Sequence, residues 1–257
     1  MHPVRLGLLL LCLLSVTPSH AASRREKADE LAARQAHALL DQRSWAQVVR
    51  IDNADASRRL PRQTWATVFE LGGRLWIYLP RTGTRSLSYY AGHLRRDKTD
   101  LTAVLGRVHE GFHAYRTIVT DNTAAVPEAM EPAAGSLPEG CFVESLAKLW
   151  SLQAEGETVI DADLVLYYGG YTARGWGHTV LCYQTPEGWF SWDSLRPSRI
   201  NRLDGDPPED VLTLARSLAS PRVASRVSDA RRLDMVLPDG PRLAAQRKSA
   251  PPRSNDG

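Results

Sequence analysis

The stretch GHTVLCYQTPEGWFSWDS, residues 177–194, predicts a β-hairpin with a histidine at the start of one strand and an aspartate at the end of the next. β-branched and aromatic residues dominate residues 178–184 and 189–193. Between them, residues 185–188 (TPEG) hold the proline and glycine that suit a tight connection. We therefore expect two antiparallel strands that bring the histidine and the aspartate near each other.

The length of the connection sets how these two side chains face. If Tyr183 pairs with Gly188, His178 lies directly opposite Asp193. If the pairing lies one residue further along in each strand, the two become diagonal neighbours on the same face. Opposed residues have Cβ atoms about 5 Å apart and diagonal ones about 7 Å apart. In both registers the carboxylate can fix the tautomer of the imidazole and stabilise its protonated form, as a general base requires.

A cysteine adds a candidate nucleophile. Cys141 follows SLPEG and opens an amphipathic helix, CFVESLAKLWSLQAEG, which Gly156 ends. The dipole and free N–H groups at a helix N-terminus stabilise a thiolate, and the Cys141 N–H can contribute to an oxyanion hole. A disulfide with Cys182 is the alternative for an exported chain. Cys182 stands about 13 Å along the strand from His178, at roughly 3.3 Å per residue, so Cys141 cannot contact both.

The segments GCFVESLAKLWSL, GHTVLCY and GWFSWDSLRP, in this order, resemble the core of transglutaminase-like cysteine peptidases, particularly the bacterial exported branch. The resemblance covers residues 137–197. It implies a papain-like α+β fold in which the helix carrying the cysteine packs on an antiparallel sheet. It also implies Cys141 as nucleophile, His178 as base and Asp193 as the acid that orients the base. Phe142 and Val143 stand where many exported members have acidic residues, so we do not expect their calcium site, and the second oxyanion donor is unassigned.

The motif HEGFH, residues 109–113, supports a different chemistry. It fits H-E-x-x-H, in which His109 and His113 share a helix face and hold zinc, Glu110 polarises a water, and Glu144 is a candidate third ligand. Its central glycine costs about 1 kcal/mol of helix stability relative to alanine, and zinc would leave Cys141 without a role. A zinc metallopeptidase is therefore an alternative to the thiol enzyme, and a non-catalytic transglutaminase-like binding domain is another.

The ends of the chain differ in composition from its middle. Arg5, an apolar run and small residues up to Ala21 form the pattern of a cleaved secretory signal, and no later window is apolar enough to span a membrane. We expect an exported protein, periplasmic or secreted, without stable membrane insertion. The expected organisation is a signal peptide over 1–21, an N-terminal helical segment over 22–60, the transglutaminase-like α+β domain over 61–215, and a disordered basic, proline-rich tail over 216–257.

Local patterns predict the elements inside these regions. The segment 64–80 predicts a hairpin that turns at Gly72-Gly73, since both positions of a two-residue turn need positive φ. Further predictions are helices over 23–42 and 101–112, an irregular stretch over 120–140, and a strand over 163–168.

The charge is modest, and it argues against nucleic acid as a partner. The formal net charge is +3, and no aromatic residues are interleaved with the basic ones. The expected function is an exported thiol hydrolase, a peptidase or amidase that needs no cofactor. Its expected substrate is a protein or peptide of the cell envelope or exterior. Hydrolysis is favoured over cross-linking, because water is abundant and the sequence shows no amine-binding site.

Overall fold

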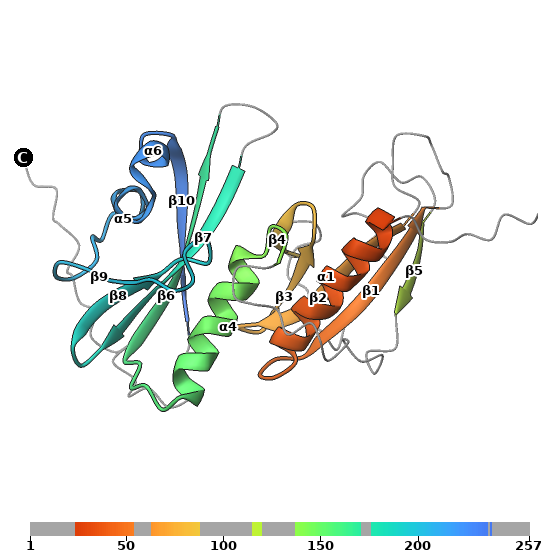
Figure 1. Ribbon diagram of the computed structural model, residues 1–257, viewed down its shortest axis with the longest axis horizontal. Helices are drawn as coiled ribbons and strands as arrows, with labels where there is room; N and C mark the ends of the chain where they lie inside the picture. Colours follow the sequence, from red (N-terminus) through yellow and green to blue (C-terminus); the bar gives the residue numbers. More distant parts are fainter. Residues whose placement is uncertain are drawn as a thin grey trace, which may run out of the picture.

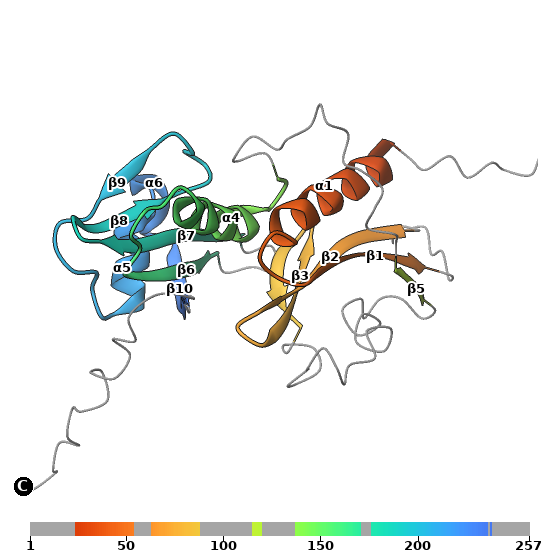
Figure 2. The same cartoon turned by 90° about the horizontal axis from the view of Figure 1, so that it is seen from below.

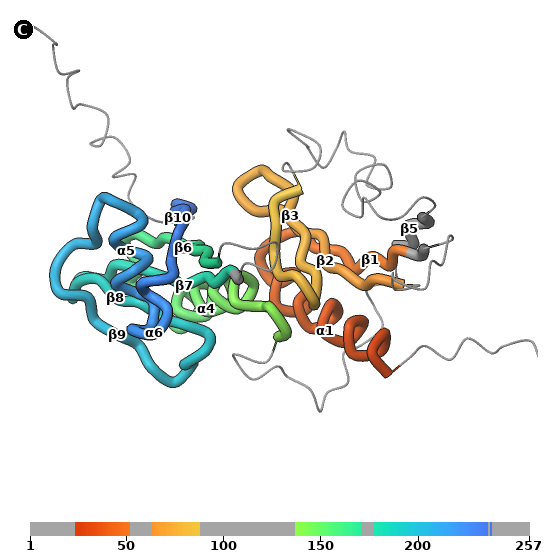
Figure 3. Tube along the Cα trace, turned by 90° about the horizontal axis from the view of Figure 1, so that it is seen from above, coloured from red at the N-terminus to blue at the C-terminus, as the bar shows by residue number. Residues whose placement is uncertain are grey.

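The computed structural model describes residues 24–53, 63–87, 115–119, 137–170, 176–235 and 237. Within them the protein is an α+β chain with two five-stranded antiparallel sheets (Figure 1). Helix α4 lies between the two sheets, as two views related by a 90° turn show (Figure 1, Figure 3). None of the helices in this part of the chain combines the length and the apolar character needed to cross a membrane.

The first sheet has the strand order β4-β3-β2-β1-β5, and helix α1 lies across one of its faces (Figure 2). The predicted hairpin is confirmed, because Gly72 and Gly73 have φ of 58° and 70° and join the two central strands. The elements of this half are α1 (Arg24–Leu40), β1 (Ala46–Asn53), β2 (Gln63–Leu71), β3 (Arg74–Leu79), β4 (Gly83–Ser86) and β5 (Tyr115–Val119).

The position of strand β1 differs from the predicted organisation, in which the α+β domain starts at residue 61. It follows α1 inside the region expected to be only helical, and it pairs with β2 along its length, from Ala46 with Phe69 to Asp52 with Gln63. Arg50 interrupts its apolar residues, which hides the strand from a search for periodicity. Strand β1 therefore belongs to the same sheet as the hairpin that follows it, and the helical segment before it packs on that sheet.

The second sheet has the order β10-β6-β7-β8-β9 and carries α4 on one face and α5 on the other. The helix predicted from the cysteine and the predicted strand in 163–168 are both confirmed. The elements of this half are α4 (Cys141–Ala154), β6 (Asp161–Gly169), β7 (Trp176–Thr185), β8 (Gly188–Trp192), β9 (Ile200–Arg202), α5 (Val211–Leu218), α6 (Pro221–Ala224) and β10 (Val227–Asp234).

The tail predicted to be disordered over 216–257 contains regular structure up to Asp234, so that prediction is wrong for this part. Strand β10 pairs with β6 from Val227 with Gly169 to Asp234 with Asp163, with a register shift between Val227 and Asp229. The sequence VSDARRLD is mostly polar, but Arg232 forms an ion pair with the buried Asp163 of β6, with an Nε–Oδ2 distance of 2.7 Å. An edge strand needs few apolar residues when a cross-strand ion pair and ladder hydrogen bonds hold it.

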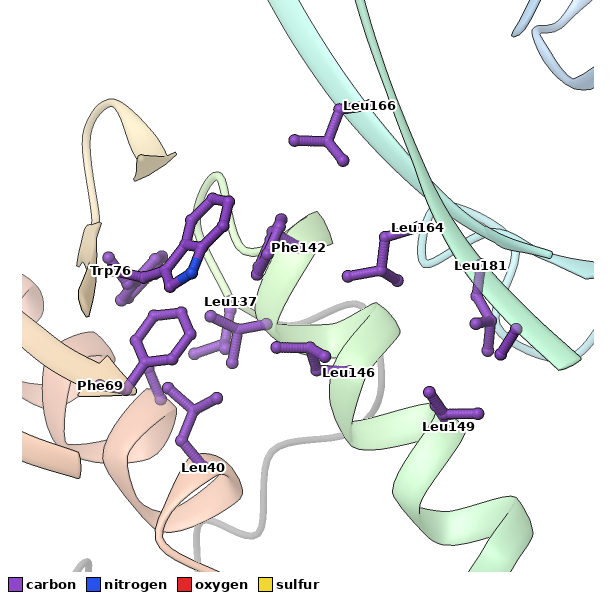
Figure 4. Packing of buried hydrophobic residues seen from close by; sticks show 14 of the residues in the cluster. Leu40, Phe69, Trp76, Leu137, Phe142, Leu146, Leu149, Leu164, Leu166 and Leu181 are labelled. Atoms are coloured by element: carbon purple, nitrogen blue, oxygen red, sulfur yellow. The ribbon is translucent and has the colours of Figure 1, made fainter. Parts of the chain in front are cut away.

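The largest hydrophobic core connects the two sheets through α4. Figure 4 shows Phe69 and Trp76 of the first sheet and Leu164 of the second on either side of this helix. Phe142, in its first turn, stacks on Trp76 with ring centroids 4.9 Å apart. Because aromatic pairs of this kind add about 0.5–1.5 kcal/mol beyond their area burial, the start of α4 is fixed against the first sheet.

Candidate active site

Cys141 is the first residue of α4, and the turn before it is sterically constrained. Gly140 donates its N–H to Leu137 O at 3.0 Å, and a Cβ at Gly140 would lie 2.2 Å from the Leu137 Cβ, so only glycine fits. The first helical hydrogen bond runs from Glu144 N to Gly140 O. The backbone N–H groups before Glu144, including that of Cys141, therefore have no acceptor within the helix.

His178 and Asp193 meet as the hairpin predicted. Gln184 pairs with Trp189, which is the second of the two registers considered, so the two side chains are diagonal neighbours. His178 Nε2 and Asp193 Oδ1 are 2.8 Å apart. The Asp193 carboxylate also accepts the N–H of Leu195 at 2.9 Å, which fixes its orientation at the end of β8.

The thiol of Cys141 reaches the same imidazole. Burial of the His178 ring acts to lower its pKa, but hydrogen bonds to Asp193 and to Cys141, with their negative charges, outweigh burial and raise the pKa to about 9. Since Asp193 engages Nε2, the ring nitrogen left for the thiol is Nδ1. The three residues singled out from the sequence therefore lie at one site, where a hydrogen bond joins His178 to Asp193 and Cys141 contributes to the raised pKa of His178.

The electrostatics of the pair favour its charged form. Burial acts to raise the pKa of Asp193, but the hydrogen bond and positive charge of His178 and the N–H of Leu195 lower it below its ordinary value. With the imidazole pKa at about 9, an imidazolium beside a carboxylate is the form present at neutral pH. The ring of Tyr167 meets the imidazole edge to face, with centroids 5.5 Å apart, and shields it on one side.

The alternative disulfide does not form, since Cys141 and Cys182 are both free. Cys182 lies in the middle of β7, fully buried, with Asp163 and Ser191 as its cross-strand neighbours. Burial, reinforced by the charge of Asp163, raises the pKa of Cys182 to about 12. It is a small core residue, as the thiol-enzyme hypothesis requires.

The alternative zinc motif, His109, Glu110 and His113, lies outside the described residues. Glu144, its candidate third ligand, is described and has a structural partner: its Oε1 accepts the N–H of Leu137 at 2.9 Å. Across the described ranges, no three His, Cys, Asp or Glu side chains are grouped so that they could hold a metal ion.

Tyr78 contacts the site and was not found from the sequence. Its hydroxyl donates to Pro138 O at 2.7 Å, in the turn before Cys141. Burial, and then the charge of Glu144, raises the pKa of Tyr78, so its phenol stays a donor. Nothing local to WIYLP indicates this role, because the partner lies 60 residues away and belongs to the other half of the fold.

The arrangement has the parts that acyl transfer needs. A thiol at a helix N-terminus can act as a nucleophile, an imidazole can move protons, and unpaired N–H groups can stabilise an oxyanion. Comparison with known proteins does not assign the chain to a family: no family model matches it, and neither a curated protein nor a solved structure does so.

Proposed function

We propose that this protein is a thiol hydrolase with a papain- or transglutaminase-like site, which cleaves a peptide or carboxamide bond through a thioester. The observation that carries the proposal is the hydrogen-bonded pair His178–Asp193 beside Cys141, which is the first residue of a helix held between two sheets. A buried ion pair of purely structural value would not need a cysteine as its third member.

The steps follow from the groups present. The Cys141 thiolate attacks the carbonyl carbon and forms a C–S bond, while backbone N–H groups of the first helical turn stabilise the oxyanion. The C–N bond then breaks, and the His178 imidazolium donates its proton to the leaving amine. Neutral His178 next takes a proton from water, which attacks the thioester carbon. The C–S bond breaks, the carboxylic acid leaves, and the thiolate–imidazolium pair is restored.

The substrate class follows from the expected export. The signal pattern in residues 1–21 supports a protein or peptide of the cell envelope or exterior as substrate. Water is the favoured acceptor of the acyl group, so hydrolysis is proposed over transfer to an amine.

The two cysteines provide a matched test. Purified protein is incubated with a peptide mixture, and new termini and released ammonia are measured by mass spectrometry and enzymatic assay. Cys141→Ala is expected to reduce turnover by at least about 10³-fold, as removal of a nucleophile does. Cys182→Ala serves as the control and is expected to keep turnover within about 3-fold, because Cys182 is only a core residue.

The thioester gives a second readout. Rapid acid quench followed by intact mass analysis is expected to trap an acyl group on Cys141, and none in the Cys141→Ala variant. Turnover that survives Cys141→Ala but is lost with bound zinc in His113→Ala would contradict the proposal and favour the metallopeptidase.

A further inference from the structure

The turn before Cys141 is held from two sides by side chains that no step of the proposed reaction uses. From the first sheet, Tyr78 donates its hydroxyl to Pro138 O at 2.7 Å. At the neighbouring β3–β4 turn, a Cβ added to Gly83 would lie 3.3 Å from Glu139 O, so the two backbones pack closely. The first sheet thus contacts the turn that leads into the nucleophile.

The second contact comes from α4 itself. Glu144 is only 6% exposed, and its carboxylate reaches back to accept the Leu137 N–H at 2.9 Å. A carboxylate in the first turn of a helix is favoured by the helix dipole. Glu144 therefore ties the start of the turn to the first turn of the helix that carries Cys141.

The backbone of residues 137–140 needs the contacts with Tyr78 and Glu144 to keep its conformation. Glu139 has a φ of 50° and is the one non-glycine residue with positive φ among the described residues. That conformation costs an ordinary residue about 1–2 kcal/mol and persists only where its surroundings enforce it. Its neighbour Gly140 sets the direction of the Cys141 N–H and thiol.

We propose that Glu144 and Tyr78 are positioning residues, which hold residues 137–140 so that the Cys141 thiol stays against His178 and the first N–H groups of α4 face the oxyanion. This inference rests on the proposed function and deepens it: the first sheet becomes part of the catalytic apparatus. Neither residue touches the reacting atoms, so their loss should impair orientation and leave substrate binding intact.

Conservative and disruptive variants of the same position separate this role from simple packing. Glu144→Gln keeps an oxygen that can accept the Leu137 N–H, whereas Glu144→Met keeps the length and removes the acceptor. We expect kcat to fall about 10- to 100-fold in Glu144→Met with KM within about 2-fold, as a small misplacement of a catalytic group does. Glu144→Gln is expected to restore kcat to within about 3-fold of the parent protein.

Substitutions of tyrosine give a second test of the positioning role. Tyr78→Phe removes only the hydroxyl that Pro138 accepts, and about a 10-fold fall in kcat is expected. Tyr183→Phe is the matched control, because Tyr183 is buried in the same core cluster and lies on β7. Thermal unfolding of every variant checks that the folded fraction at the assay temperature is unchanged.

A labelling measurement that needs no substrate distinguishes a failure of the positioning role from a failure of the proposed hydrolase function. The rate of iodoacetamide modification of Cys141 at pH 6 reports its contact with His178, and we expect it to fall about 10-fold in Glu144→Met and Tyr78→Phe. Unchanged kcat and labelling in folded Glu144→Met and Tyr78→Phe would overturn the positioning role. If labelling falls as expected but Cys141→Ala never alters turnover, positioning stands and the proposed function fails.

Discussion

Cys141 and Cys182 are the same side chain in two opposite settings. Cys141 opens a helix, is partly exposed and lies against an imidazole, whereas Cys182 lies mid-strand, fully buried, and its pKa is raised to about 12 by burial and the charge of Asp163. Cys141 has a charged imidazole beside it, whereas the surroundings of Cys182 penalise a negative sulfur. The comparison shows that the place of a cysteine in the fold, and not its identity, sets the surroundings of its sulfur.

The largest effect expected from this difference is in labelling. With iodoacetamide at pH 6 and 25 °C, Cys141 in the native protein should be modified at least about 10³-fold faster than Cys182, which is reached only when the second sheet opens. Peptide mapping by mass spectrometry over time gives both rates in one sample. In denaturant the two rates should converge. Equal rates in the native protein would remove the basis for distinguishing the two cysteines.

The pH dependence of the His178–Asp193 pair gives a second test of how the surroundings of Cys141 differ from those of Cys182. The folded-state pKa of His178 is about 9, above its ordinary 6.5, so its charged form contributes stability that is complete below about pH 6.5 and is lost as pH rises through about 9. Asp193 has a lowered pKa and contributes stability above its ordinary value, which is lost as pH falls. The imidazolium form of His178, and turnover with it, should therefore decline above about pH 9.

Asp193→Asn removes the negative charge and should return the His178 pKa towards 6.5. The fraction of imidazolium at pH 8.5 would fall by up to about 80-fold for a full return to 6.5, and kcat/KM with it, while the loss at pH 6 would be smaller. The pH profile of kcat/KM and NMR titration of the His178 ring give two independent measurements. Asp210→Asn is the matched control, since that exposed carboxylate caps α5 away from the pair. An unshifted basic limb in Asp193→Asn would contradict the role of the carboxylate.

Short sequence patterns predict some features of the site but not others. The facing of His178 and Asp193 follows from the parity of a short connection, and the position of Cys141 follows from a helix start, so both were predicted from within a few residues. The site as a whole needs more. The contact of Tyr78 with Pro138 depends on how the two sheets pack around α4, and no nearby pattern encodes that packing.

The prediction of disorder for the segment that forms β10 was wrong for a related reason. Arg232 forms an ion pair with Asp163 of β6, so a charged segment that looks unstructured alone gains its ion-pair partner and its ladder hydrogen bonds only from a distant strand. Strand β1 was missed because Arg50 breaks its apolar residues, although the residues around it are buried against β2. In each case the missing information is a contact between distant segments. The zinc motif at 109–113 lies outside the described residues and stays a prediction.

The smallest expected effect concerns the stability contributed by Cys182. Cys182→Ser places a hydroxyl at a fully buried position of β7 opposite Asp163 and Ser191, and a hydroxyl that finds no partner there should lower the free energy of unfolding by about 1–3 kcal/mol. Cys182→Ala removes the sulfur without adding a polar atom, so we expect a smaller loss, about 1 kcal/mol. Urea unfolding followed by tryptophan fluorescence measures both. Neither change should alter the iodoacetamide rate at Cys141, because Cys182 acts through packing alone; a serine variant as stable as the parent protein would show that the hydroxyl has a hydrogen-bond partner, with Asp163 and Ser191 the nearest candidates.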